Sequence, residues 1–140
     1  MLIRDIMSKD IEIVAPDAFL HEVARKMSQR DVGSVIVVRD DRLIGMITDR
    51  DIAVRCVAEG HDSSDTTAEK IMTPEILYCR DTDDADTVAR DMAKNKVRRM
   101  PVLDANKRLV GLITLGDLAS HSNHLLCGQV LGEICTRAAA

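Results

Sequence analysis

The segment Gly-x-Ile-Thr-x-x-Asp occurs twice in this chain, at residues 45–51 and again at residues 111–117. A threonine followed three residues later by an acid is the capping box of a helix N-terminus, so a single copy would indicate a cap and nothing more. Two copies at equivalent places favour a binding site. The hydroxyl and the helix N–H groups would face an anion, and the carboxylate would accept hydrogen bonds from two vicinal hydroxyls. We therefore expect a ribose and its phosphate to bind at four residues: Thr48, Asp51, Thr114 and Asp117.

Two adjacent arginines, Arg98 and Arg99, precede the apolar segment Met100–Leu103. At the start of a strand such a pair would ordinarily be half solvated, with one side chain on each face. Guanidinium groups also bind phosphate oxygens in a bidentate manner, so this pair is the candidate for phosphate binding. The matching stretch in the first half of the chain, Val32–Val35, is small and uncharged. If both halves bind phosphate, the half with the arginines should bind it more tightly.

These segments belong to a longer internal repeat. Ile6-Met7-Ser8 returns as Ile71-Met72-Thr73, and Val23-Ala24-Arg25 returns as Val88-Ala89-Arg90. Self-similarity on this scale indicates one supersecondary unit used twice, and such units usually bury their apolar faces against each other. The cleft between the two copies is therefore where we first expect a functional site.

Each copy has the hydrophobic pattern of a strand, a helix, two further strands and a second helix. In the first copy, the expected elements are a strand at 11–14, a helix capped by Asp17, a hairpin of residues 35–38 and 43–47, and a helix at about 49–59 that Gly60 ends. In the second copy, they are a strand at 76–79, a helix with an apolar stripe at 85–92, and a hairpin of residues 100–103 and 109–113. The small, polar join between the copies is expected to be an exposed linker.

A tail follows the second copy. Its apolar residues favour an amphipathic helix that is interrupted or bent near Gly128: Leu125, Leu126, Val130, Leu131 and Ile134. This stripe has no evident partner within the repeat, so we expect it to form a self-association surface.

The composition argues against several classes of function. The formal net charge of −4 over 140 residues disfavours binding to nucleic acid or to anionic membranes, which calls for a basic surface. Phe19 and Tyr78 are the only aromatic residues, which weakens any site based on aromatic stacking of bases. The N-terminus lacks the apolar core of a signal peptide and no stretch reaches transmembrane length, so we expect a cytoplasmic protein. The four cysteines have no CxxC spacing and are expected to be free thiols.

With these motifs, the chain resembles a tandem pair of CBS domains, the Bateman module, in its stand-alone bacterial form. The resemblance rests on the Ile-Met-Ser/Thr openings, the Met-Pro-Val-Leu-Asp strand and the paired Gly-x-Ile-Thr-x-x-Asp segments, and it covers about residues 3 to 120. It implies an α/β (α+β) fold of two βαββα repeats related by a pseudo-two-fold axis, with packed sheets and helices outside. It also implies a homodimer. The domain boundaries that we expect are repeats at 1–60 and 70–120, a linker at 61–69 and a helical tail at 121–140.

The resemblance assigns roles by position. Asp51 and Asp117 match the ribose-binding aspartates, Thr48 and Thr114 match their hydroxyl partners, and Arg98 and Arg99 lie where some members bind phosphate. The base of a ligand held by Asp117 would be flanked by Ile11, Val32, Gly33 and Ser34, and that of a ligand held by Asp51 by Ile76, Val97, Arg98 and Arg99. The uncharged Gly33-Ser34 departs from the family pattern, which leaves occupancy of the first cleft open.

We therefore expect a non-catalytic sensor that binds an adenine nucleotide (AMP, ADP, ATP or NAD) as a regulatory ligand in the inter-repeat cleft. It would signal to a regulated partner protein through a change of conformation or of dimer packing. The alternative is an interaction scaffold with unoccupied clefts. A metal-dependent enzyme is disfavoured, because His121, His124 and Cys127 follow at intervals of three and could not easily converge on one ion. We expect no required cofactor and no metal.

Overall fold

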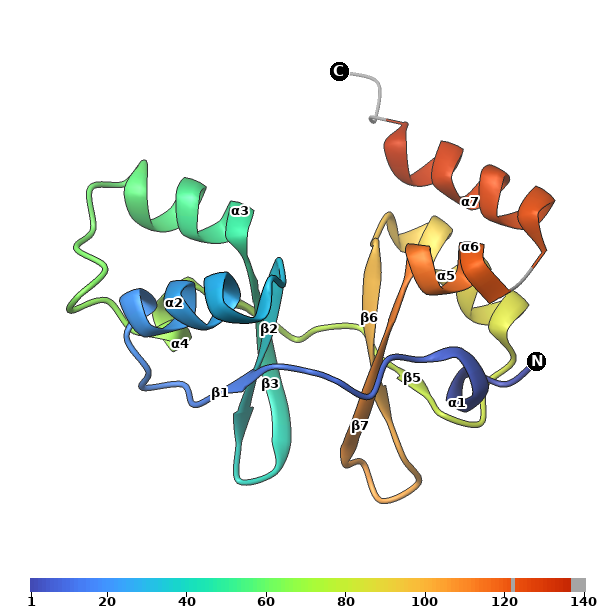
Figure 1. Cartoon of the computed structure of the whole chain (residues 1–140), viewed down its shortest axis with the longest axis horizontal. Helices are drawn as coiled ribbons and strands as arrows, with labels where there is room; N and C mark the ends of the chain where they lie inside the picture. Colours follow the sequence, from blue (N-terminus) through green and yellow to red (C-terminus); the bar gives the residue numbers. More distant parts are fainter. Residues whose placement is uncertain (122, 137–140) are drawn as a thin grey trace. The chain divides into compact units, whose positions relative to one another are not determined.

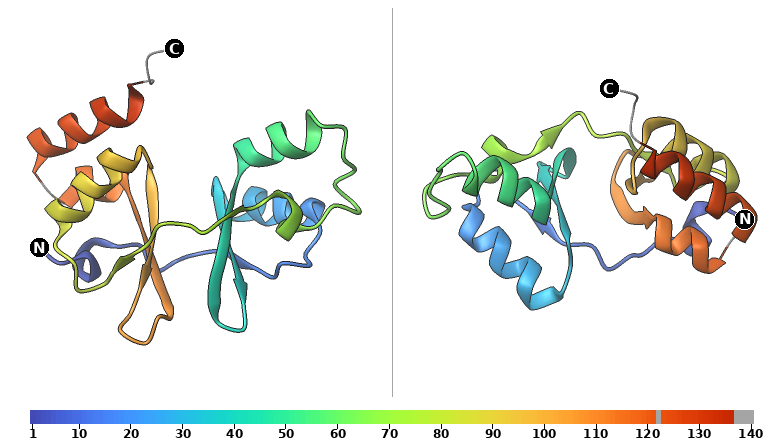
Figure 2. Two further views of the ribbon diagram at one scale, coloured as in Figure 1. Left: turned by 180° about the vertical axis from the view of Figure 1, so that it is seen from behind. Right: turned by 90° about the horizontal axis from the view of Figure 1, so that it is seen from above.

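The computed structural model describes residues 1–121 and 123–136, which form two compact units. The middle unit holds Ile11–Ile76, and the terminal unit combines Met1–Asp10 with the chain from Leu77 onward. Each unit contains a small sheet with helices against one of its faces (Figures 1 and 2). This arrangement confirms the predicted α/β class and the repetition of its elements.

The middle unit is built on a sheet with the strand order β1-β2-β3-β4. Strand β1 runs parallel to β2, and the other neighbours are antiparallel. Helix α2 and the α3–η1 segment lie on the same face of this sheet (Figure 2). The elements are β1 (Ile13–Val14), α2 (Leu20–Arg30), β2 (Ser34–Arg39), β3 (Arg42–Thr48), α3 (Asp49–Asp51), the π-helical η1 (Ile52–Val57), α4 (Ala68–Ile71) and β4 (Thr73–Pro74).

The terminal unit has a sheet with the order β5-β6-β7, in which β5 is parallel to β6 and β6 is antiparallel to β7. Helices α5 and α6 lie on one face of this sheet, and α7 packs against both of them (Figure 1). The elements are α1 (Ile3–Ile6), β5 (Cys79–Arg80), α5 (Ala85–Asn95), β6 (Arg99–Leu103), β7 (Leu109–Thr114), α6 (Leu115–His121) and α7 (His124–Cys135).

The apolar spacing of the sequence predicted helices α2 and α5. Leu20, Val23 and Met27 of α2 are buried, as are Val88 and Met92 of α5. Each helix is followed by one residue in the left-handed conformation, with φ of 52° after α2 and 54° after α5. The backbone then reverses into the central strand of its sheet.

The start of α2 differs from the prediction, because Asp17 does not cap it. The N-cap residue is Phe19, whose side chain makes no capping hydrogen bond. A backbone carbonyl of the join between the repeats takes that role, since Leu20 N–H donates to Thr66 O at 2.9 Å. The join was expected to be an exposed linker, and most of its residues are exposed, but Thr66 is buried. The hydrogen bond from Leu20 N–H to Thr66 O therefore ties the join to the N-terminus of α2.

The opening segments of the repeats complete the sheets of the units in which they pack. In the middle unit, Thr73 of β4 pairs with Met46 of β3. In the terminal unit, Ser8 pairs with Leu112 of β7 through two backbone hydrogen bonds of 2.9 Å. The first ten residues thus pack with the second repeat, and the packing units cut across the expected sequence boundaries at 60 and 70.

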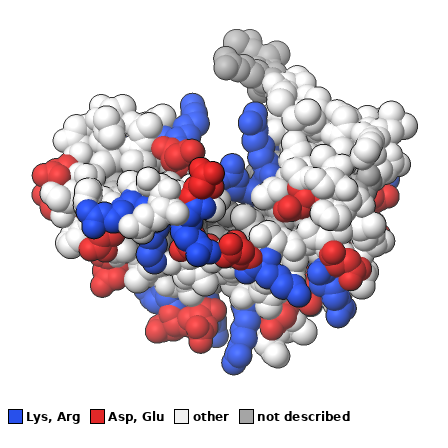
Figure 3. Space-filling view, in the orientation of Figure 1, with Lys and Arg blue, Asp and Glu red and all other residues white. Residues whose placement is uncertain are grey.

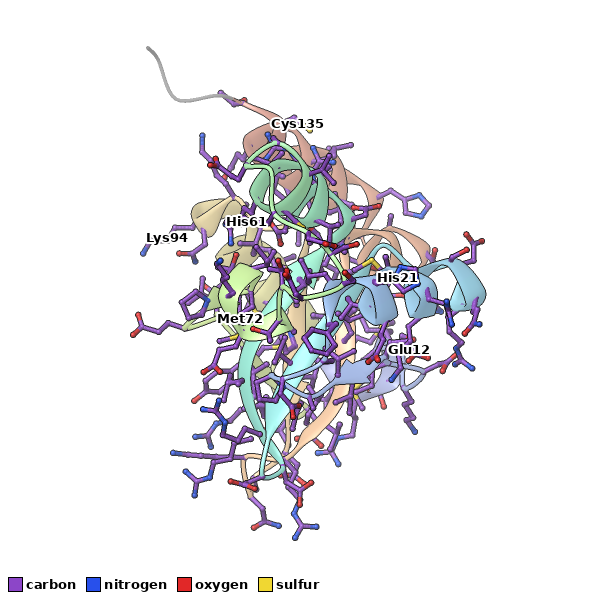
Figure 4. All side chains as sticks on the ribbon, turned by 90° about the vertical axis from the view of Figure 1, so that its left-hand side faces the viewer. Glu12, His21, His61, Met72, Lys94 and Cys135 are labelled. Carbon is purple, nitrogen blue, oxygen red and sulfur yellow. The ribbon has the colours of Figure 1, made fainter. Side chains whose placement is uncertain are left out.

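The glycine of each Gly-x-Ile-Thr-x-x-Asp segment makes room for the methionine of an opening segment. A Cβ atom at Gly45 would lie 2.5 Å from Sδ of Met72, which Figure 4 labels. A Cβ atom at Gly111 would lie 2.6 Å from Met7 Sδ. These separations are well inside van der Waals contact, so a larger residue would force the packed neighbours to move. At both glycines, the space that a Cβ atom would take is therefore occupied by a methionine of the same unit.

The tail corrects a second prediction. Helix α7 is continuous through Gly128, and its apolar stripe packs against α5 instead of remaining without a partner. The buried residues are Leu126, Cys127, Val130 and Ile134, which belong to the core of the terminal unit. Leu125 and Leu131 lie on the outer side of the helix and are 72% and 46% exposed. Residues 122 and 137–140 of the expected tail lie outside the described residues.

Candidate functional site

In the terminal unit, the predicted capping box forms where β7 ends and α6 begins. The backbone N–H and the hydroxyl of Thr114 both donate to Asp117 Oδ2 at 2.9 Å. The Asp117 N–H donates back to Thr114 Oγ1 at 3.1 Å. Both residues are half-buried. The box occupies one oxygen of the carboxylate, Oδ2, and none of its hydrogen bonds uses Oδ1.

The middle unit forms the same box where β3 ends and α3 begins. Thr48 N–H donates to Asp51 Oδ2 at 2.9 Å, and Asp51 N–H donates to Thr48 Oγ1 at 3.1 Å. The helix-cap interpretation of both segments is therefore correct at the level of geometry. It does not exclude ligand binding, because each aspartate retains a second oxygen outside the box.

The two second oxygens have different surroundings. In the middle unit, Asp51 Oδ1 lies 3.8 Å from Arg55 Nε, one helical turn along the chain. The residue that follows Asp117 by the same interval is His121, and one of its ring nitrogens lies 3.0 Å from the backbone oxygen of Asp117. Within the described part of the chain, Asp117 Oδ1 has no hydrogen-bond or ion-pair partner. Arg55 was missed in the sequence, although aligning the two repeats places it opposite His121.

The hairpin of the terminal unit brings the predicted phosphate-binding residues next to the capping box. Arg99 of β6 is the register partner of Thr114 on β7. Leu115 N–H, at the start of α6, donates to Arg98 O at 3.0 Å. Arg99 is half-buried and Arg98 is exposed. The arginine pair at the start of β6, the Thr114 hydroxyl and the Asp117 carboxylate therefore lie at the same end of this sheet.

The corresponding end of the middle unit has equivalent backbone pairing, with Gly33 and Ser34 in the positions of the arginine pair. Ser34 is the register partner of Thr48, and Asp49 N–H donates to Gly33 O at 3.0 Å. A Cβ atom at Gly33 would lie 3.3 Å from Oδ2 of the exposed Asp49 side chain, a tight contact. Gly33 and Ser34 therefore occupy the same positions in the middle unit as Arg98 and Arg99 occupy in the terminal unit.

The predicted base-flanking residues fall in both units. The middle unit contains Ile11, Val32, Gly33, Ser34 and Ile76, and the terminal unit contains Val97, Arg98 and Arg99. The predicted sets join Asp117 to residues of the middle unit, and Asp51 to residues of the terminal unit. These groupings stay predictions, as does the occupancy of either cleft.

The end of α7 lies beside the arginine pair. Arg98 Nη2 is 3.8 Å from Sγ of Cys135, which is labelled at the end of α7 in Figure 4. Lys96 Nζ donates to the backbone oxygen of Thr136 at 2.6 Å. The tail is therefore attached to the segment that leads into β6, a contact that no sequence motif indicated.

Charge is mixed over the surface. Acidic and basic side chains both occur on the face shown in Figure 3, and the part over α7 carries few charges. Among the described residues, no group of three or more His, Cys, Asp and Glu side chains could hold a metal ion. His21 and His61, labelled in Figure 4, are exposed. No helix in the described ranges is both long and apolar enough to span a membrane.

Three of the four cysteines, Cys56, Cys79 and Cys127, are buried, and Cys135 is exposed. Burial raises the pKa of the Cys79 thiol to about 12, and the nearby Asp83 carboxylate adds to the effect. Because the thiolate is the reactive form, Cys79 is inert near neutral pH. Cys79 and Cys127 belong to the core of the terminal unit, and Cys56 belongs to the core of the middle unit.

Comparison with known proteins identifies the repeat. A family model of the CBS domain matches residues 3–57 and again residues 68–124. The chain is 37% identical to CBS domain-containing protein YhcV of Bacillus subtilis over 117 residues, which are 84% of this chain and 82% of that protein. It is 34% identical to Hypoxic response protein 1 of Mycobacterium tuberculosis over 134 residues, covering 95% and 93% of the two chains.

Two solved structures share the fold. A crystal structure of Hypoxic Response Protein I with two coordinated zinc ions superposes with a TM-score of 0.79 at 34% identity, over 88% of this chain and 100% of that one. A crystal structure of CBSX2 in complex with AMP superposes with a TM-score of 0.74 at 23% identity, over 85% and 93% of the two chains. At that identity the CBSX2 likeness shows the fold alone.

Proposed function

Since the chain belongs to the CBS domain family, in tandem form, we propose that it is a non-catalytic regulatory module that binds an adenine nucleotide. The observation that carries the proposal is the end of the terminal sheet, where Arg99 pairs with Thr114 beside Asp117. A carboxylate oxygen without a described partner suits the two hydroxyls of a ribose. A guanidinium group suits a phosphate, and in the predicted sets Arg98 and Arg99 face the ligand that Asp51 would hold. Arg99 stands at the start of β6, and Asp117 lies in the first turn of α6, where the capping box with Thr114 holds it.

The aliphatic residues among those predicted to flank the base would hold it. Ile11, Val32, Ile76 and Val97 offer apolar surface without an aromatic ring. A purine would then be held by burial of its faces and not by aromatic stacking. The ligand class is adenosine-containing, with AMP, ADP, ATP and NAD as candidates. The CBSX2 complex is an AMP complex of a protein with this fold.

The proposal includes a homodimer and a partner protein that responds to the ligand. A bound nucleotide shifts a conformational equilibrium only by its difference in affinity between two states. The regulated output therefore requires a second state of the module or of its dimer. Light scattering with and without nucleotide tests the dimer and its response to ligand.

The ligand class is tested by thermal unfolding in the presence of AMP, ADP, ATP, NAD and S-adenosylmethionine. A ligand present at 100 times its Kd should stabilise the folded protein by about 2.7 kcal/mol. Guanosine monophosphate and inorganic phosphate serve as controls for the base and for the anion. A melting temperature that no compound of the panel changes would support the alternative, a scaffold with unoccupied clefts.

The role of Asp117 is tested by Asp117→Asn. Asparagine keeps an oxygen that can accept from Thr114 N–H, so the helix cap survives while the charge is lost. Because a hydrogen bond to a charged group contributes about 1.5–3 kcal/mol, the nucleotide Kd should rise roughly 10- to 100-fold. The matched control is Asp84→Asn, which alters the aspartate that caps α5 through Thr87 N–H at 3.1 Å. Equal loss in both variants, or no loss in either, would refute the assignment to Asp117.

A further inference from the structure

The two capping boxes share the same pair of reciprocal hydrogen bonds and differ in what faces the remaining carboxylate oxygen. In the middle unit that oxygen, Asp51 Oδ1, faces the Arg55 guanidinium at 3.8 Å. In the terminal unit the equivalent helical position is His121, which interacts with the backbone oxygen of Asp117 and not with its carboxylate. A ribose held by an aspartate needs this outer oxygen, so the difference bears on ligand binding directly.

Arg55 is held where it stands by two further hydrogen bonds. Its Nη1 donates to the Ile71 backbone oxygen and to Thr73 Oγ1, both at 3.0 Å. These acceptors belong to α4 and β4, the opening segment that completes the sheet of the middle unit. The guanidinium is therefore positioned by three groups, and its approach to Asp51 is part of the local fold. A ligand at Asp51 would have to compete with it.

We propose that Arg55 is a specificity-determining residue that weakens the Asp51 site for ribosyl ligands, so that the Asp117 site fills first. This inference rests on the proposed nucleotide binding and adds an order of filling to it. The Arg55–Asp51 pair is partly exposed, with side chains 45% and 18% accessible. Pairs of this kind contribute little to stability, which limits the expected effect on affinity to about fivefold or less.

Calorimetric titration of the full chain with adenosine tests the proposal, because adenosine carries the ribose without a phosphate. The wild-type protein should show a tighter and a weaker binding event. Asp117→Asn should weaken the tighter event roughly 10- to 100-fold, and Asp51→Asn should weaken the other event. Arg55→His should tighten the weaker event by up to about fivefold, and His121→Arg should loosen the tighter event by a similar factor.

The controls separate the role of Arg55 in ligand binding from its role in folding. Arg50→His makes the same charge change on the preceding helical turn, where the side chain is exposed, and should leave both events unchanged. Arg55→His removes the anchors to Ile71 and Thr73, so its far-UV spectrum and melting temperature are measured first. His121→Arg removes neither anchor and tests the proposal even if Arg55→His does not fold.

Parallel titrations with AMP test the opposite role for Arg55, in which its guanidinium group would bind the phosphate and strengthen ligand binding. If Arg55→His weakened AMP binding while leaving adenosine binding unchanged, Arg55 would be a phosphate-binding residue and the proposal would be wrong. Two adenosine-binding events of equal affinity in the wild type would also refute the proposal about Arg55, as would loss of the tighter event in Asp51→Asn. Either result would leave the proposed nucleotide binding intact. Absence of binding by either compound would refute the nucleotide-binding function itself and the inference with it.

Discussion

A helix cap and a ribose-binding group are compatible roles for one aspartate, because a carboxylate has two oxygens. In both Thr-x-x-Asp segments the cap uses Oδ2, and the outer oxygen decides what the residue can do. For Asp117 the outer oxygen has no partner within the described residues, and for Asp51 it faces Arg55. Single-residue differences between two copies of one motif can thus give the copies different functions.

The residue scale also explains the glycines of the two motifs. Replacing Gly111 by alanine would place Cβ 2.6 Å from Met7 Sδ and 2.9 Å from Ser8 O. We expect Gly111→Ala to lower the free energy of unfolding by about 1–3 kcal/mol, as overpacking does in a dense interior. Urea denaturation measures the change.

The matched control for this prediction is Gly128→Ala. Nothing lies within 4 Å of a Cβ atom there, and the residue is in the middle of α7. Alanine favours a helix over glycine by up to about 1 kcal/mol, so this variant should be neutral or stabilised. Equal stability of Gly111→Ala and wild type would show that the methionine packing is looser than the structure indicates.

Thiol reactivity tests the burial of the cysteines. Near pH 8, a disulfide reagent such as Ellman's should modify Cys135 quickly and the three buried thiols only slowly. The raised pKa of Cys79 keeps that thiol protonated in the folded state. Since the folded state therefore holds a proton that the unfolded state loses above its pKa of 9.0, this group lowers stability as pH rises from about 9 to 12. Rapid modification of more than one thiol in the folded protein would contradict the assigned burial.

At the scale of elements, α7 acts as an outer layer of the terminal unit. Val130 is buried against the core, whereas Leu131 lies outward on the same helix. We expect Val130→Ala to cost about 1–3 kcal/mol of unfolding free energy, because it leaves a cavity beside α5. Leu131→Ala should change stability by less than about 0.5 kcal/mol. Chemical denaturation of the two variants compares them directly, and an equal cost would mean that α7 does not pack as described.

The residue pattern of the sequence predicted those elements whose structure is decided by residues close to one another in the chain. The hairpin expected at 35–38 and 43–47 lies inside β2 and β3, because β-branched runs joined by a short polar turn have few alternatives. The capping boxes were predicted for the same reason. The cap of α2 and the partner of α7 depend on contacts distant in sequence. Asp17 has the right residue type for a cap, yet Phe19 takes the position because Thr66 O already satisfies the helix.

Of the candidate site, only the part that depends on residues close in sequence was predicted. Thr114 and Asp117 form their box within one turn, so their spacing alone indicated it. Arg55 reaches Asp51 from the next turn and is fixed by Ile71, which lies on another element. The position of its side chain depends on the packing of α4 and could not be inferred from the motif.

At the scale of the whole molecule, the first ten residues belong to the unit that the last part of the chain forms. Ile3 and Ile6 are buried in its core, and the backbone of Ser8 extends β7. We expect Ile3→Ala to cost about 2–5 kcal/mol and to raise hydrogen exchange in β7 before it does so in β3. Hydrogen-exchange mass spectrometry resolves the two strands. Faster exchange in β3 first would show that the opening segment supports the other unit.

This exchange of segments sets an order for folding on the ribosome. Residues 11–76 are contiguous, so the middle unit can fold as soon as they have emerged. Residues 1–10 emerge before the middle unit but must wait for β7, which lies about a hundred residues further along the chain. The buried side chains of Ile3 and Ile6 therefore remain without their core until β7 has been synthesised.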